Sequence, residues 1–123
     1  MLFRSEGKDL PGVLAYRDIA DTQAMIDAAA QYREAVVIGG GLLGLEAANG
    51  LMKRGMKVTV VHATDWLMER QLDQQAGHML QASLQDRGMA FKMNAFTQAL
   101  RPGPDGRVQS VRSEEHTSEL QSH

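Results

Sequence analysis

The chain of 123 residues contains no cysteine. This absence excludes disulfides, thiolate metal sites and a dithiol redox pair from these residues, so any redox chemistry would have to come from a bound cofactor. The chain also lacks the run of roughly 18 apolar residues that a membrane-spanning helix needs, and its first residues lack the apolar core of a signal peptide. We therefore expect no membrane partner and, by default, a cytoplasmic location.

An excess of charge of one sign is also missing. Lysine and arginine number 13 against 15 aspartate and glutamate residues, and no segment concentrates the basic ones. This balance argues against binding to nucleic acid or to an anionic membrane. The four histidines show no spacing typical of metal ligands, so we expect no metal site. With 43% hydrophobic and 23% charged residues, the composition is that of a globular protein. The absence of a basic cluster favours a small molecule as its partner.

What the chain does contain is an alternation of strand and helix patterns. Short apolar runs rich in β-branched residues predict strands, and the first of them, residues 35–38, has the continuous pattern of a central strand buried on both faces. Apolar residues at helical spacing predict helices, two of which end at glycines. The predicted strands are 35–38, 56–61 and 90–93, and the predicted helices are 18–32, 42–54 and 72–87. This order indicates the α/β class, with a Rossmann-like parallel βαβαβ sheet.

A turn-forming segment follows the third predicted strand. Residues 102–106 have the sequence Pro-Gly-Pro-Asp-Gly, and β patterns flank them at 95–100 and 107–111. We expect a β-hairpin there, or the start of a meander, because proline and glycine adopt the backbone angles that tight turns require.

The two ends of the chain differ in character from its middle. Residues 1–17 are expected to be an entry linker, and residues 18–111 a single α/β domain that is incomplete at its C-terminus. Residues 112–123 show no strand or helix period, and one back-translation of them resembles a sequencing-adapter oligonucleotide. We therefore expect this tail to be foreign, the natural protein to continue past Val111, and the fragment alone to be inactive.

The motif with the clearest chemistry is Gly39-Gly40-Gly41-Leu42-Leu43-Gly44, a G-x-G-x-x-G pattern. It follows a predicted buried strand and opens a predicted helix, the context in which this pattern binds the pyrophosphate of a dinucleotide. The first glycine allows the tight turn, the second lets the phosphates approach the backbone, and the third lets the helix pack on the sheet. The free N–H groups of the helix then receive the negative charge. The alternative is that the glycines only form a tight strand-helix junction.

The position that closes the second predicted strand belongs to the same pattern. A carboxylate there usually binds the adenosine ribose, but this chain has His62. No lysine or arginine occurs in residues 63–69 to bind a 2′-phosphate, and Asp65 would oppose one, so NADH is favoured over NADPH. His62 could also be only a strand-end histidine. Glu46 is either a carboxylate favoured by the helix dipole or a functional residue, and His78 is expected to face solvent.

Residues 36–48, which contain the glycine motif, resemble the second nucleotide-binding motif of flavoproteins of the pyridine nucleotide-disulfide oxidoreductase type. More narrowly, residues 10–13, 58–62 and 66–73 are similar to the large subunits of assimilatory nitrite reductases. The resemblance implies that NAD(P)H docks on the glycine turn and passes hydride to FAD held by an adjoining domain. It also implies that residues 18–111 are an NAD(P)H-binding domain and that residues 1–17 are the linker from a missing FAD domain.

For this chain, the resemblance implies cofactor-binding residues but no catalytic residue and no metal ligand. Gly39, Gly41 and Gly44 would hold the pyrophosphate, His62 would lie at the adenosine ribose, and Glu46 would lie towards the nicotinamide and the flavin. In nitrite reductases of this kind, sirohaem and an iron-sulfur cluster in further domains reduce nitrite to ammonia.

Three other hypotheses remain open. A rubredoxin or ferredoxin reductase would use the same domain with another electron acceptor. The absence of a redox cysteine pair from this chain fits this type and the nitrite reductase type equally. The glycine turn could instead bind FAD, although His62 stands where flavin-binding motifs usually have a carboxylate. Finally, the chain could be a non-catalytic nucleotide-binding module.

Overall fold

The computed structural model describes residues 7, 9–15 and 19–115. Its elements alternate as the hydrophobic patterns predict. In chain order they are α1 (Ile19–Gln31), β1 (Glu34–Ile38), α2 (Leu42–Lys53), β2 (Lys57–Val61), α3 (Gln74–Asp86), β3 (Ala90–Lys92), β4 (Ala95–Pro102) and β5 (Val108–Glu115). None of the helices in the described ranges is long and apolar enough to cross a membrane.

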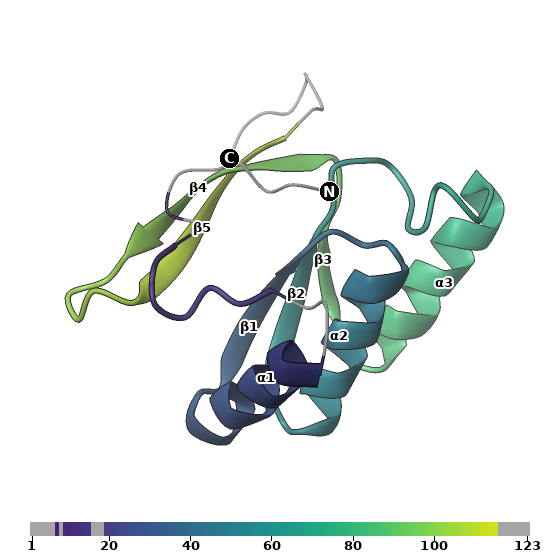
Figure 1. The fold of residues 1–123 in the computed structure, drawn as a ribbon. Helices are drawn as coiled ribbons and strands as arrows, with labels where there is room; N and C mark the ends of the chain where they lie inside the picture. The colour runs from purple at the N-terminus through teal and green to yellow at the C-terminus, as the bar shows by residue number, and fades with distance from the viewer. Residues whose placement is uncertain (1–6, 8, 16–18, 116–123) are drawn as a thin grey trace.

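The strands form two sheets, and together with the helices they give the predicted α/β class. One sheet is parallel with the order β1-β2-β3, and the other is the antiparallel hairpin β4-β5. Helix α2 contacts β1 and β2, and β4 also contacts β2. Figure 1 shows the helices on one side of the parallel sheet and the hairpin on the other. The carboxyl ends of β1 and β2 meet at one edge, since Ile38 pairs with Val61.

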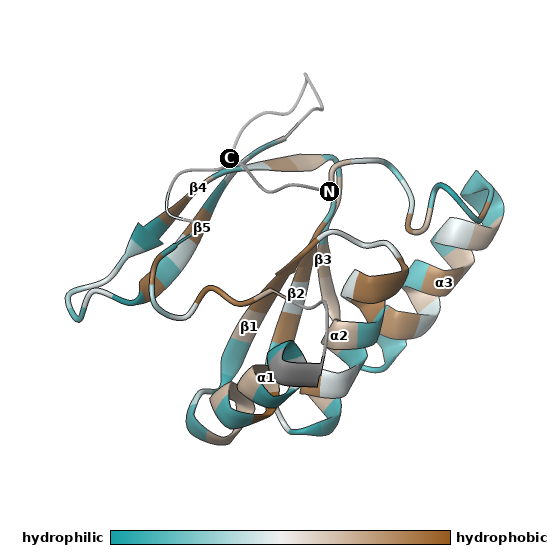
Figure 2. Cartoon of the chain, viewed as in Figure 1, coloured by the Kyte–Doolittle hydropathy of each residue, from teal (hydrophilic) through white to brown (hydrophobic). Residues whose placement is uncertain are grey.

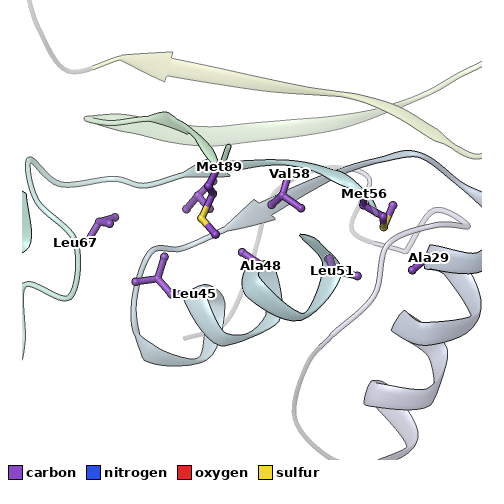
Figure 3. Packing of buried hydrophobic residues seen from close by; sticks show 9 residues of the cluster. Ala29, Leu45, Ala48, Leu51, Met56, Val58, Leu67 and Met89 are labelled. Carbon is purple, nitrogen blue, oxygen red and sulfur yellow. The ribbon is translucent and has the colours of Figure 1, made fainter. Parts of the chain in front are cut away.

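The core lies between the parallel sheet and the helices. Ala48 of α2 is fully buried, and its small side chain lets the helix lie close to Val58 and Val60 of the central strand β2. Figure 3 shows that the cluster extends from Leu67, in the loop after β2, to Ala29 of α1. Strongly hydrophobic residues gather in β1, β2 and the adjoining turns of α2, whereas the tip of the hairpin is hydrophilic (Figure 2).

The prediction that β1 is a central strand buried on both faces is wrong for the described residues. Strand β1 lies at the edge of the sheet, and its residues alternate between exposed and half-buried. Ala35 and Val37 pack against the core, while Val36 and Ile38 are 46% and 41% exposed. Because the contacts of the hairpin with the parallel sheet centre on β2, the second face of β1 stays open to solvent.

The ends of the domain depart from the sequence-based boundaries. Strand β5 continues through Glu115, so residues 112–115, which were expected to have no strand structure, pair with β4. The remainder of the expected tail lies outside the described residues, as does most of the segment 1–8. Residues 13–15 form no strand. The preceding segment lies against the hairpin instead, because the Val108 N–H donates to the Pro11 carbonyl at 2.8 Å.

Candidate dinucleotide-binding site

The glycine turn joins the carboxyl end of β1 to the first turn of α2. Gly39 has a φ of 106°, which disfavours any side chain, and its N–H donates to the Val61 carbonyl at 2.8 Å. A Cβ atom added to Gly44 would lie 1.9 Å from the Gly39 carbonyl oxygen. Only glycine at position 44 therefore lets the helix close this tightly on the end of the strand.

The opposite face of the turn is open. A Cβ atom added to Gly41 would meet nothing within 4 Å, and Leu42 and Leu43 are 59% and 58% exposed. Gly41 is also the N-cap of α2, and no side chain caps this helix. The first N–H groups of an α-helix have no acceptor within the helix, and the helix dipole adds positive character there. The turn therefore presents N–H donors on an accessible surface that suits a phosphate group.

Gly40, the middle glycine of the turn, is held by the segment that follows β2. Its N–H donates to His62 Nδ1 at 2.8 Å, and its carbonyl accepts from the Met68 N–H at 3.0 Å. A Cβ atom at Gly40 would lie 2.6 Å from Cδ2 of the fully buried Leu67. The motif itself does not predict these contacts, because they depend on how the loop after β2 folds back over the turn.

His62 is buried, with 6% of its surface exposed. Because Nδ1 accepts a hydrogen bond from the Gly40 N–H, the ring in this arrangement carries its hydrogen on Nε2. That N–H is directed at three acceptors: Glu69 Oε1 at 2.9 Å, Thr64 Oγ1 at 3.0 Å and the Trp66 carbonyl at 3.1 Å. Both ring nitrogens are thus engaged by the protein. The contact with the adenosine ribose stays a prediction.

Glu69 is the site residue that sequence analysis missed. Its side chain is 34% exposed and lies seven positions after His62, across a loop without any periodic pattern. Partial burial raises the pKa of Glu69. The hydrogen bond from its own backbone N–H, the interaction with His62 and the hydrogen bond with Thr64 together outweigh burial, so the net pKa lies below its ordinary value. The structure therefore places a charged carboxylate beside the ring of His62.

Asp65, Glu46 and His78 lie away from this network. Asp65 accepts from Gln74 Nε2 at 3.1 Å and from Asn94 Nδ2 at 3.2 Å, so its carboxylate is directed at α3 and the segment after β3. Glu46 is exposed and follows the first turn of α2, which contains no acidic residue. Glu46 therefore lies early in α2 but past its first turn, and its place towards the nicotinamide stays a prediction. His78 is exposed, as predicted, with Nε2 3.1 Å from the Asp65 carbonyl.

Residues 34–117 match the family model described as pyridine nucleotide-disulphide oxidoreductase. The chain belongs to this family. The resemblance inferred from the glycine motif is therefore confirmed. Within the described part of the chain, no three histidine, aspartate or glutamate side chains are grouped so that they could hold a metal ion.

Similar proteins differ in their named activities. The chain is 50% identical over 112 residues to nitrite reductase [NAD(P)H] of Bacillus subtilis, which covers 91% of the chain and 14% of that protein. It is 34% identical over 104 residues to a rubredoxin-NAD(+) reductase of Ectopseudomonas oleovorans, covering 85% of the chain and 27% of that protein. A ferredoxin reductase structure from Rhodopseudomonas palustris superposes with a TM-score of 0.86 at 21% identity, covering 92% of this chain and 28% of that one. The chain thus spans a small part of these longer proteins.

Proposed function

We propose that residues 18–111 form the NAD(P)H-docking domain of an FAD-dependent oxidoreductase, in which NADH delivers hydride to FAD. The observation that carries this proposal is the open, uncapped N-terminus of α2 beside the glycine turn. The accessible face at Gly41 leaves room for a pyrophosphate against the backbone, and the helix N–H groups would neutralise part of its charge. The residues present therefore fit the dinucleotide.

The chain's own residues bind and orient the cofactor. The backbone of residues 39–44 would hold the pyrophosphate, His62 lies at the end of β2 where the adenosine ribose is expected, and Glu46 on the exposed side of α2 would lie towards the nicotinamide and the flavin. When bound, NADH would supply a hydride, and FAD held by an adjoining domain would accept it. We assign no catalytic residue to these positions, and NADH is favoured over NADPH.

The nitrite reductase large subunit is the parent protein that we favour. Its support is the 50% identity over 112 residues to the Bacillus subtilis enzyme. In such a parent, electrons from FAD would continue to sirohaem and an iron-sulfur cluster outside this chain. The 34% identity to a rubredoxin-NAD(+) reductase supports the second candidate, a rubredoxin or ferredoxin reductase. The complete reading frame decides between them, because only the first candidate requires a cysteine-rich cluster segment downstream.

Titration of NADH into the chain by calorimetry tests the docking proposal. We expect Gly41→Asp to weaken NADH binding about tenfold or more, because the added carboxylate would meet the pyrophosphate at close range. Gly41 has an extended backbone with φ −85° and ψ −170°, so aspartate fits there without strain. Gly50→Asp, farther along α2 with open space around it, is the matched control and should bind like the wild type.

Two results would contradict the proposal: no NADH binding by the wild-type chain, or equal NADH affinity in the Gly41→Asp variant. A parallel titration with FAD tests the alternative that the turn belongs to a flavin-binding domain. Tighter binding of FAD than of NADH would support that alternative.

A further inference from the structure

We infer that His62 is a positioning residue, which fixes the glycine turn through its Nδ1 atom while Glu69 holds the ring in the required tautomer. This inference rests on the proposed NADH docking and deepens it. The usual residue at the end of the second strand acts on the ribose directly. In this chain the ring of His62 lies between the glycine turn and the carboxylate of Glu69. The ring acts on the cofactor through the backbone of Gly40.

The first step of the argument concerns the peptide planes on either side of Gly40. All described peptide bonds are trans, and in a trans peptide the C=O and N–H groups point in opposite directions. The Gly40 carbonyl is held by the Met68 N–H, so the Gly41 N–H in the same peptide unit is turned away from the loop. The contact between the Gly40 N–H and His62 fixes the preceding peptide unit in the same way.

The second step concerns what happens without an acceptor at Nδ1. Gly40 is buried, and Leu67 packs over it. A buried N–H without a partner is unfavourable, so the turn would rearrange to bring this group to water. Such a rearrangement would move the Gly41 N–H away from the accessible face. The NADH affinity therefore depends on an acceptor at the δ position of residue 62.

The third step concerns the tautomer. A neutral histidine carries its hydrogen on either nitrogen, and only the form protonated at Nε2 accepts from Gly40. Glu69 Oε1 lies 2.9 Å from Nε2, and an ionised carboxylate has no hydrogen to donate, so it acts purely as a hydrogen-bond acceptor. Its lowered pKa keeps it ionised at neutral pH. Glu69 therefore favours the tautomer that supports the glycine turn.

Two substitutions of His62 test the roles of its two ring nitrogens separately. His62→Asn keeps an acceptor oxygen at the δ position and loses the group that reaches Glu69. His62→Gln places its amide at the ε position, within reach of Glu69, and leaves a methylene facing Gly40. A merely structural role for the side chain predicts similar effects of both. Circular dichroism and thermal denaturation of each variant verify that the chain is folded before NADH is titrated.

We expect His62→Asn to bind NADH within about threefold of the wild type and His62→Gln to bind about tenfold more weakly, since the second leaves a buried donor unpaired. Equal affinities in the two variants would overturn the inference while leaving the proposed function in place. Failure of the wild-type chain to bind NADH would overturn both.

Nitrogen-15 NMR of the His62 ring in the free chain gives a readout that is independent of NADH. The expected spectrum at neutral pH shows the shifts of an unprotonated Nδ1 and a protonated Nε2. In Glu69→Gln we expect a larger share of the other tautomer. An Nδ1-protonated or doubly protonated ring in the wild type would contradict the inference, even if both His62 variants fold.

Discussion

At the scale of single residues, the chemistry of the site depends on pairs that the fold creates. His62 and Glu69 are separated by a loop, yet their side chains meet at 2.9 Å. A hydrogen bond to an ionised group is stronger than one between neutral groups, although solvent weakens it where the carboxylate is partly exposed. Glu69 therefore contributes to stability only while it is charged.

The first prediction concerns the pH dependence of the Glu69→Gln variant. The folded-state pKa of Glu69 lies below its ordinary value of 4.5, so its stabilising effect is fully present above that pH and is lost as the pH falls through the folded-state pKa. We expect the variant to be less stable than the wild type at pH 7, by about 1 kcal/mol or less because the side chain is partly exposed. Urea denaturation at a series of pH values should show this difference shrinking below pH 4.5. Glu34→Gln on β1 serves as the control, and a difference independent of pH would contradict the assignment.

At the scale of elements, each of the two helices beside the site contains a glycine, and the space around the two glycines differs. Gly77 of α3 lies under the loop after β2, and a Cβ atom there would be 2.5 Å from Trp66 Cδ1 and 2.8 Å from the Leu67 carbonyl oxygen. Gly50 of α2 has no neighbour within 4 Å of such an atom. The first glycine allows close packing of an element, whereas the second only lowers helix propensity.

Alanine substitution at these two positions should therefore change stability in opposite directions. Alanine favours a helix over glycine by about 1 kcal/mol, so Gly50→Ala is expected to raise the free energy of unfolding by up to that amount. Gly77→Ala gains the same propensity but forces the loop away from α3, and we expect a net loss of roughly 1–3 kcal/mol. Thermal denaturation of the two variants is the measurement. A stabilised Gly77→Ala variant would show that the loop does not rest on α3.

At the scale of the whole molecule, the helices pack on one face of the parallel sheet, and the hairpin contacts the other face at the central strand β2. Val60 in the central strand is fully buried, whereas Val36 in the neighbouring edge strand is 46% exposed. Both are β-branched residues that suit a strand, so local sequence does not distinguish them. Their exposures differ because Val60 packs in the core between the sheet and the helices, whereas Val36 lies on the open face of the edge strand.

Threonine substitutions measure this difference, since threonine has nearly the shape of valine but adds a hydroxyl group. We expect Val60→Thr to lower the free energy of unfolding by about 1–3 kcal/mol, because the hydroxyl is buried among apolar side chains. Val36→Thr should change it by less than about 0.5 kcal/mol. Chemical denaturation with both variants tests the layered arrangement. Equal losses would indicate that the open face of β1 is covered in solution.

Much of the fold follows from local sequence. The apolar β-branched runs and the helical spacing located the parallel strands and the helices within about two residues, because side-chain periodicity reports which faces must be buried. The predicted start of α3 at Leu72 was two residues early, since Asp73 caps the helix by accepting from the Ala76 N–H. The glycine turn was found for the same local reason, as its neighbouring strand and helix are contiguous with it.

The sequence by itself thus determined the α/β order, the turn and the glycine at position 44 that lets α2 approach the sheet. Only the tertiary structure decided that β1 is an edge strand among the described residues, that Asp65 is directed at α3, and that Glu69 reaches His62. The physical reason is distance along the chain: hydrophobic periodicity acts over one helical turn or one strand, whereas these contacts form only after loops and layers have come together.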